Sequence, residues 1–96
     1  MFKLTLVSIL ALAGAVQAAE CYGNKGGSHN GDDIYGAREQ VCNGGGNAGG
    51  DGFSITASGP RTNCWQALDN IIHQCASNGQ SGYWFLNDET YQIQIN

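Results

Sequence analysis

The sequence of 96 residues has few basic side chains, with 4 Lys and Arg against 8 Asp and Glu. Proteins that bind nucleic-acid phosphates or anionic lipid depend on clustered positive charge, so this balance argues against both partners. Beyond its N-terminal segment, the chain has no apolar run long enough to span a bilayer. We therefore expect one small domain that neither binds nucleic acid nor inserts into a membrane.

Several motifs that carry known chemistry are also missing. The chain has no Cys-x-x-Cys pair, no His-Glu-x-x-His sequence and no Gly-x-Ser-x-Gly elbow. The two histidines, His29 and His73, lie far apart, which argues against a zinc site. The glycine-rich stretch 43–52 lacks the flanking elements of a phosphate loop and is interpreted as a flexible loop. The sequence thus predicts no catalytic residue, no metal and no cofactor.

The N-terminal segment has the pattern of a secretory signal peptide. A short positive start that contains Lys3 is followed by an uncharged apolar run at 4–16, then by small residues that end at Ala18. The run of about 13 residues is too short to cross a bilayer as a helix. Cleavage after Ala18 leaves 78 residues with a net charge of −5. We expect residues 1–18 to be removed and residues 19–96 to form a single cysteine-rich domain outside the cell.

The four cysteines all lie in the predicted mature chain, and an even number in a short secreted protein indicates disulfides. Cys64 and Cys75 fall on one predicted helix, about 16 Å apart along its axis. A disulfide requires Cα atoms within roughly 7 Å, so these two cannot pair with each other. Either Cys21–Cys75 occurs with Cys42–Cys64, or Cys21–Cys64 occurs with Cys42–Cys75. We prefer the first pairing, because antiparallel helices bring Cys42 close to Cys64.

Two segments have the apolar spacing of amphipathic helices. The first spans 31–42, with Asn30 as its expected N-cap. The second spans 63–77, where Asn63 and Gln66 have the spacing of a capping box. One face of this second helix carries a continuous apolar stripe: Cys64, Ala67, Leu68, Ile71, Ile72 and Cys75.

The remaining ordered segments are predicted strands. Apolar and polar residues alternate over 53–58, and a hairpin is expected over 82–96 with its turn at 87–89. A short edge strand is expected around Cys21. The order of elements predicts an α+β fold, a small disulfide-stabilised two-layer sandwich with two helices on one face of a short antiparallel sheet.

The segment 83–86 is apolar at every position, although adjacent side chains of a strand point to opposite faces. One pair must therefore face away from the helices, where it is available for binding. We predict that Trp84 and Leu86 are this pair, and that Tyr83 and Phe85 pack in the core. Trp65 lies at the margin of the helical stripe. The candidate binding residues are Trp84, Leu86, Trp65 and Tyr22.

The segment from Asn63 to Cys75, followed by a glycine-bearing turn and an aromatic strand, resembles the second half of fungal small secreted cysteine-rich proteins. Two groups share this arrangement: killer-toxin-like and effector α/β sandwiches, and small glycan-binding proteins of mushrooms. The second group also begins near a Cys-Tyr and carries a Cys-Asn-Gly after its first helix, which Cys21-Tyr22 and Cys42-Asn43-Gly44 match. The resemblance implies a secreted protein that binds a target.

Three functions are therefore compared. The favoured one is a secreted, non-enzymatic effector or toxin-like protein that binds an extracellular protein or glycan. The alternative is a lectin-like glycan-binding module, in which exposed aromatic side chains stack on sugar rings. The third is a secreted guanyl-type ribonuclease. We favour it least because such enzymes build their sites on sheet strands, whereas Glu39 and His73 are expected on helices. Its components would have to come from Arg38, Glu39, Arg61, His29 and His73.

Overall fold

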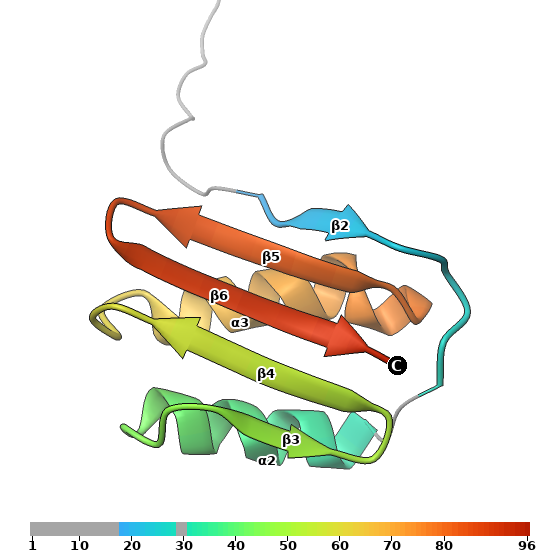
Figure 1. Ribbon diagram of the computed structural model, residues 1–96, viewed down its shortest axis with the longest axis horizontal. Coiled ribbons are helices and arrows are strands. Elements are labelled where there is room, and N and C mark those ends of the chain that lie inside the picture. Colours follow the sequence, from blue (N-terminus) through green and yellow to red (C-terminus); the bar gives the residue numbers. More distant parts are fainter. Residues whose placement is uncertain (1–17, 29–30) are drawn as a thin grey trace, which may run out of the picture.

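The computed structural model describes residues 18–28 and 31–96. In that part of the chain, two helices pack on one face of a five-stranded antiparallel sheet, which confirms the predicted fold class (Figure 1). The predicted signal peptide, apart from Ala18, and the predicted N-cap Asn30 lie outside the described residues. The elements, in chain order, are β2 (Glu20–Tyr22), α2 (Gly31–Cys42), β3 (Ala48–Gly50), β4 (Phe53–Ser58), α3 (Cys64–Gln74), η1 (Ala76–Asn78), β5 (Ser81–Leu86) and β6 (Glu89–Ile95).

The strands lie in the order β2-β5-β6-β4-β3, so the two shortest strands form the edges of the sheet. β2 confirms the strand expected near Cys21. The prediction of a continuous loop over 43–52 is wrong for β3, which pairs with β4. Gly52 takes a φ of 85° in the turn between them, a conformation that glycine adopts without strain. Glycines have little strand propensity of their own, so pairing with β4 decides this element.

Both helices bury the faces that their spacing predicts. In α2 these are Ile34, Ala37 and Val41. α3 ends at Gln74, earlier than expected, and a short 3-10 turn continues to Gly79, whose φ of 69° stops the helix. The buried residues of α3 are Cys64, Ala67, Leu68, Ile71 and Ile72.

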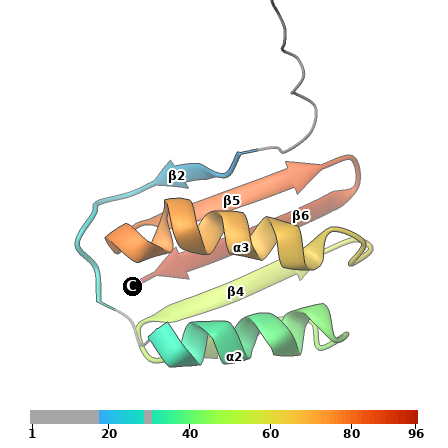
Figure 2. The ribbon, with the colours of Figure 1, turned by 180° about the vertical axis from the view of Figure 1, so that it is seen from behind.

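Two disulfides clamp the helical layer. Cys42 is bonded to Cys64 and Cys21 to Cys75, with Cα atoms 5.5 and 5.4 Å apart, which confirms the preferred pairing. Figure 2 shows the reason: α2 and α3 run in opposite directions, so the end of one lies beside the start of the other. The second bond joins the end of α3 to the edge strand β2. Both ends of α3 are therefore held by covalent bonds.

The start of α3 is held by an acidic side chain of β6. The predicted capping box is not formed, because Asn63 makes no side-chain hydrogen bond to the helix. Instead, the Asn63 backbone N–H donates to Glu89 Oε1 (2.9 Å) and its side-chain amide donates to Oε2 (3.0 Å). The Tyr91 hydroxyl donates to Oε1 as well (2.6 Å). Burial raises the pKa of Glu89, but these hydrogen bonds and nearby Arg61 together hold it below its usual value.

The hairpin of β5 and β6 decides which side chains enter the core. Its loop has two residues, because Leu86 pairs with Glu89. Asn87 takes a φ of 57° there, which asparagine tolerates. The predicted turn over 87–89 is therefore one residue too long. A slip of one residue moves every side chain to the other face, so the predicted orientation of the segment 83–86 is reversed.

The exposed position predicted for Trp84 is consequently wrong. Trp84 pairs with Tyr91 across the hairpin, and their ring centroids lie 5.9 Å apart. Only 1% of Trp84 is exposed, so it is one of the largest side chains of the core between sheet and helices. Tyr83 and Phe85 point to the other face.

Candidate binding site

The sheet has one covered and one open face. Figures 1 and 2 show α2 and α3 on the same side of the sheet, and in the described part of the chain no helix lies on the other side. The strand register places three parallel columns of side chains on this open face. They are the aromatic column of Tyr22, Tyr83 and Phe85 on β2 and β5, and the two polar columns of Thr90, Gln92 and Gln94 on β6 and of Ser54, Thr56 and Ser58 on β4.

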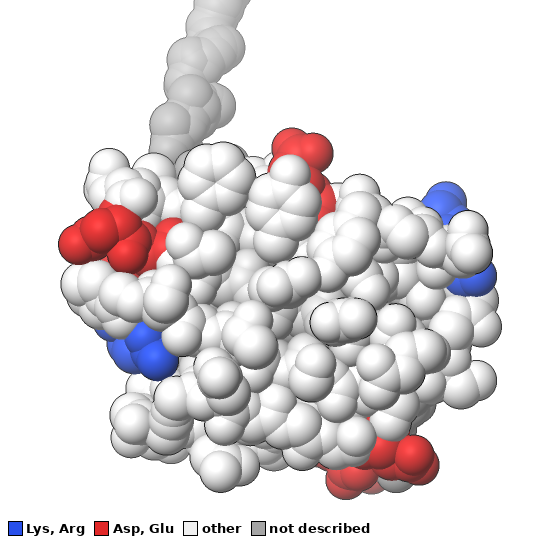
Figure 3. Space-filling model, viewed as in Figure 1, with Lys and Arg blue, Asp and Glu red and all other residues white. Residues whose placement is uncertain are grey.

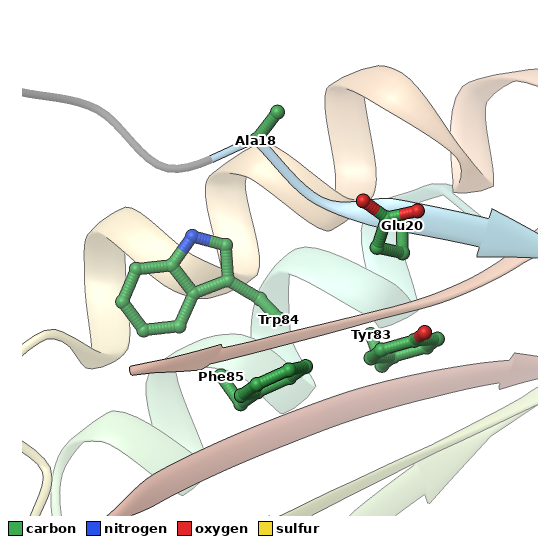
Figure 4. A pocket seen from close by; sticks show the side chains of 5 residues that line it. All are labelled: Ala18, Glu20, Tyr83, Trp84 and Phe85. Carbon is green, nitrogen blue, oxygen red and sulfur yellow. The ribbon is translucent and has the colours of Figure 1, made fainter. Parts of the chain in front are cut away.

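The aromatic column consists of three rings in contact. The ring centroids of Tyr22 and Tyr83 lie 6.1 Å apart, and those of Tyr83 and Phe85 lie 5.9 Å apart with planes within 10° of parallel. Figure 4 shows Tyr83 and Phe85 side by side on the same side of β5. The side-chain amide of Gln92 donates to the Tyr22 hydroxyl and fixes that ring. Since Phe85 is 51% exposed and Tyr22 36%, the column is accessible.

The open face is almost free of charge. Glu20 is the one ionisable carboxylate that the register of the described strands places on it, opposite Tyr83, and no Lys or Arg lies in these strands. Figure 3 shows acidic and basic side chains around the margin of this face and a broad uncharged centre. A ligand that matches the face in charge is therefore neutral.

A cleft of about 370 Å³ lies beside the aromatic column, at the edge where β2 begins. Ala18, Glu20, Tyr83, Trp84 and Phe85 line it (Figure 4). Ala18 is the last residue of the predicted signal peptide, so in the mature chain the other four residues form the walls of the cleft. Its walls are thus mainly apolar, with a single carboxylate. The cleft extends the aromatic surface toward β2, so the site is a platform with a shallow groove along one side.

The four predicted binding residues lie in different parts of the structure. Tyr22 belongs to the aromatic column, whereas Trp84 is buried in the core. Leu86 is 37% exposed because it ends β5, but the alternation of the strand places it on the face of Trp84. Trp65 is 43% exposed and lies on α3, on the opposite side of the sheet. The four do not form one surface.

Trp65 takes part in a contact between the two helices. The guanidinium of Arg38 lies between two rings, 5.0 Å from the centroid of Trp65 and 4.9 Å from that of Tyr35. Arg38 also forms a salt bridge with Asp69. The contact of Arg38 with Tyr35 lies within α2, whereas its contact with Trp65 and its ion pair with Asp69 link α2 to α3, which explains Trp65 without a ligand.

The residues considered for a ribonuclease site do not converge. Arg38 is engaged between the helices, and Glu39 is exposed on α2. Arg61 precedes α3 and the exposed His73 lies near its end, so the two residues lie toward opposite ends of a helix about 16 Å long. His29 lies outside the described residues. No acid–base pair is assembled from the described members of this set.

Two further observations concern the described residues only. No group of three or more His, Cys, Asp or Glu side chains there is placed to hold a metal ion. None of the helices described is both long and apolar enough to cross a bilayer.

Tyr83, Phe85 and Gln92 are the site residues that the sequence interpretation missed. The sequence of the hairpin contained the information needed to predict them. The alternation of β6 already placed Tyr91 in the core, and a two-residue turn, which an Asn at its first position favours, pairs Tyr91 with Trp84. The neighbours of Trp84 must then face outward.

The chain matches no protein-family model, no curated protein and no solved structure. The resemblance to fungal cysteine-rich proteins stays a prediction.

Proposed function

We propose that this chain is a secreted, non-enzymatic effector or toxin-like protein that acts outside the cell by binding its target on the open face of the sheet. Two disulfides in a domain of this size are compatible with an extracellular protein. The signal-peptide pattern of residues 1–18 supports the same localisation. The target in this proposal is an extracellular protein or a glycan.

The observation that carries the proposal is the exposed aromatic column. Small soluble domains place few large aromatic side chains together on a surface, and such patches mark interaction sites. Here Phe85 and Tyr22 are exposed beside Tyr83, although the same strand buries Trp84 completely. Tyrosine suits a binding surface because its ring supplies apolar area and its hydroxyl supplies a hydrogen bond.

A lectin-like module is the second candidate, and one feature favours it. The aromatic column lies next to the amides of Gln92 and Gln94 and to the hydroxyl of Thr90. Sugars present apolar C–H faces and hydroxyl groups together, so rings beside amides offer both kinds of contact. This candidate uses the same face as the first.

The proposal is tested with the secreted, fluorescently labelled protein on intact fungal, plant and animal cells. We expect N-terminal sequencing to begin at Ala19 and labelling of at least one cell type. The double variant Tyr83→Ala/Phe85→Ala should bind at least about tenfold more weakly while keeping its circular dichroism spectrum. Trp65→Ala, which removes an exposed aromatic side chain from the helical side, is the matched control and should bind normally.

Either of two results contradicts the proposal. Equal binding by the double variant and the unmodified protein would exclude the open face. Failure to label any cell type would argue against a target on these surfaces.

A further inference from the structure

The aromatic column has a direction. Tyr22 lies opposite Ser81, and Tyr83 and Phe85 follow at steps of two residues, so the three rings occupy successive levels along β5. Their centroids are 6.1 and 5.9 Å apart. A single terminal sugar is usually held in a closed pocket, whereas a row of rings offers contacts to several consecutive units. The nearly parallel rings of Tyr83 and Phe85 lie along β5, and the row then steps to Tyr22 on β2, whose ring is tilted by 46°. The geometry therefore favours a linear ligand that runs along β5 and passes over the edge strand β2.

The polar columns run in the same direction. Thr90 pairs with Phe85 and Gln92 with Tyr83, so hydroxyl and amide groups flank the rings level by level. On β4, Ser58 and Thr56 continue these rows. Hydroxyls and amides both donate and accept hydrogen bonds, as a sugar hydroxyl does. A chain above the rings would meet hydrogen-bonding groups along one whole side.

The charge of the face restricts the ligand further. The strands that form it contain no Lys or Arg, and Glu20 lies beside the aromatic column. Apart from the amino group that the predicted cleavage creates at Ala19, next to Glu20, sulfated or uronic acid polymers would meet a carboxylate and no cationic side chain of these strands, which disfavours them. The ligand that fits is uncharged.

We propose that the aromatic column binds the interior of an extended, uncharged β-1,4-linked polysaccharide, an inference that rests on the open-face site of the proposed function. In a β-1,4-linked chain the pyranose rings form a flat ribbon, with C–H groups on its faces and equatorial hydroxyls along its edges. One face stacks on the nearly parallel rings of Tyr83 and Phe85, and the Tyr22 ring, tilted by 46°, contacts the next unit of the chain at an angle. One edge reaches the column of Thr90, Gln92 and Gln94, while the other lies toward the cleft beside Glu20.

The test is isothermal titration calorimetry of the mature protein with cellohexaose and chitohexaose, which share the linkage and differ in the N-acetyl group. We expect binding to at least one hexaose and an affinity that rises from the disaccharide to the trisaccharide and tetrasaccharide as more rings are covered. Glucose, N-acetylglucosamine and polygalacturonate should not bind. Tyr83→Ala/Phe85→Ala should lower the affinity for the bound hexaose by at least about tenfold, and Trp65→Ala should leave it unchanged.

Several outcomes overturn the inference. These are the absence of binding to both hexaoses, equal affinity for the monosaccharide and the hexaose, and tighter binding of polygalacturonate. If the double variant loses cell binding while neither hexaose binds, the polysaccharide is wrong but the proposed function stands. If the double variant keeps full affinity for a hexaose and for cells, both proposals are wrong.

Discussion

The two faces of β5 differ more than its sequence suggests. Trp84 and Phe85 are neighbours in a run of large apolar residues, yet Trp84 is 1% exposed and Phe85 51%. Trp84 meets Tyr91 in the layer beneath the helices, whereas Phe85 lies beside Tyr83 on the open face. The covered face thus supplies stability, and the open face presents rings that the fold does not need to bury.

This difference shows how a small domain combines a core with an open aromatic surface, the proposed binding site. Two helices and two disulfides cover one face of the sheet, and the described chain has no third layer for the other. Aromatic residues on the uncovered face then contribute little to folding, because they stay in contact with water. Their position on that face is what the proposed binding function rests on.

The largest expected effect comes from removing a ring from the covered face, and removing one from the open face is the comparison. Trp84→Ala should lower the free energy of unfolding by about 3–5 kcal/mol, because it leaves a cavity in the core. Phe85→Ala should change it by less than about 1 kcal/mol, since its ring is half exposed. Urea denaturation followed by circular dichroism measures both, and similar losses in the two variants would contradict the division between the faces.

Gly59 packs closely against the hairpin loop, and its replacement has the next largest expected effect. It has a φ of 87°, and a Cβ atom built there would lie 1.9 Å from the backbone oxygen of Asp88. Gly59→Ala should lower the free energy of unfolding by about 1–2 kcal/mol, because alanine is strained in the left-handed conformation. Displacement of the loop by the new methyl group should lower it further.

Gly36→Ala is the matched control for that variant. Gly36 lies within α2 with open space around its Cα atom, so alanine should stabilise the protein by about 0.5–1 kcal/mol. Melting temperatures measure both effects. A neutral Gly59→Ala variant would show that the loop tolerates a side chain and does not determine the register.

The buried carboxylate on the covered side gives the smallest effect, and it depends on pH. Glu89 has a folded-state pKa below its ordinary value of 4.5, so its ionised form stabilises the fold at pH above that value. This contribution should disappear as the pH falls through the folded-state pKa. Glu89→Gln should cost about 1 kcal/mol at pH 7, the difference between charge-assisted and neutral hydrogen bonds.

The test of Glu89 is urea denaturation of both proteins from pH 7 to pH 2. The stability difference between wild type and Glu89→Gln should shrink toward acid. Glu20→Gln, an exposed substitution on the open face, is the control. Its free energy of unfolding should lie within about 0.5 kcal/mol of wild type at pH 7. A difference for Glu89→Gln that stays constant with pH would exclude the anionic role of Glu89.

The sequence predicted the helices and the main strands, because each depends on short-range spacing. It left two disulfide pairings open, and the expected antiparallel arrangement of the helices favoured the one observed. The stripe from Cys64 to Cys75 repeats at the helical period, and this alone excluded a bond between the two cysteines. The candidate site was predicted poorly. Of its aromatic column only Tyr22 was among the candidates, while Trp84 was placed on the wrong face through a turn one residue too long.

What the sequence determined by itself is therefore the two helices, the strands other than β3 and the residues that α3 buries, since periodicity and cysteine spacing are properties of one segment. Only the tertiary structure decided the strand at Ala48–Gly50, the acceptor at Glu89 for the start of α3, and the face on which Trp84 and Phe85 lie. Each of these depends on pairing between segments, where a shift of one residue reverses every side chain of a strand. The segment 83–86 is apolar at every position, so its sequence is compatible with either face toward the helices. The pairing of Trp84 with Tyr91 and the packing under the helices decide which face is buried.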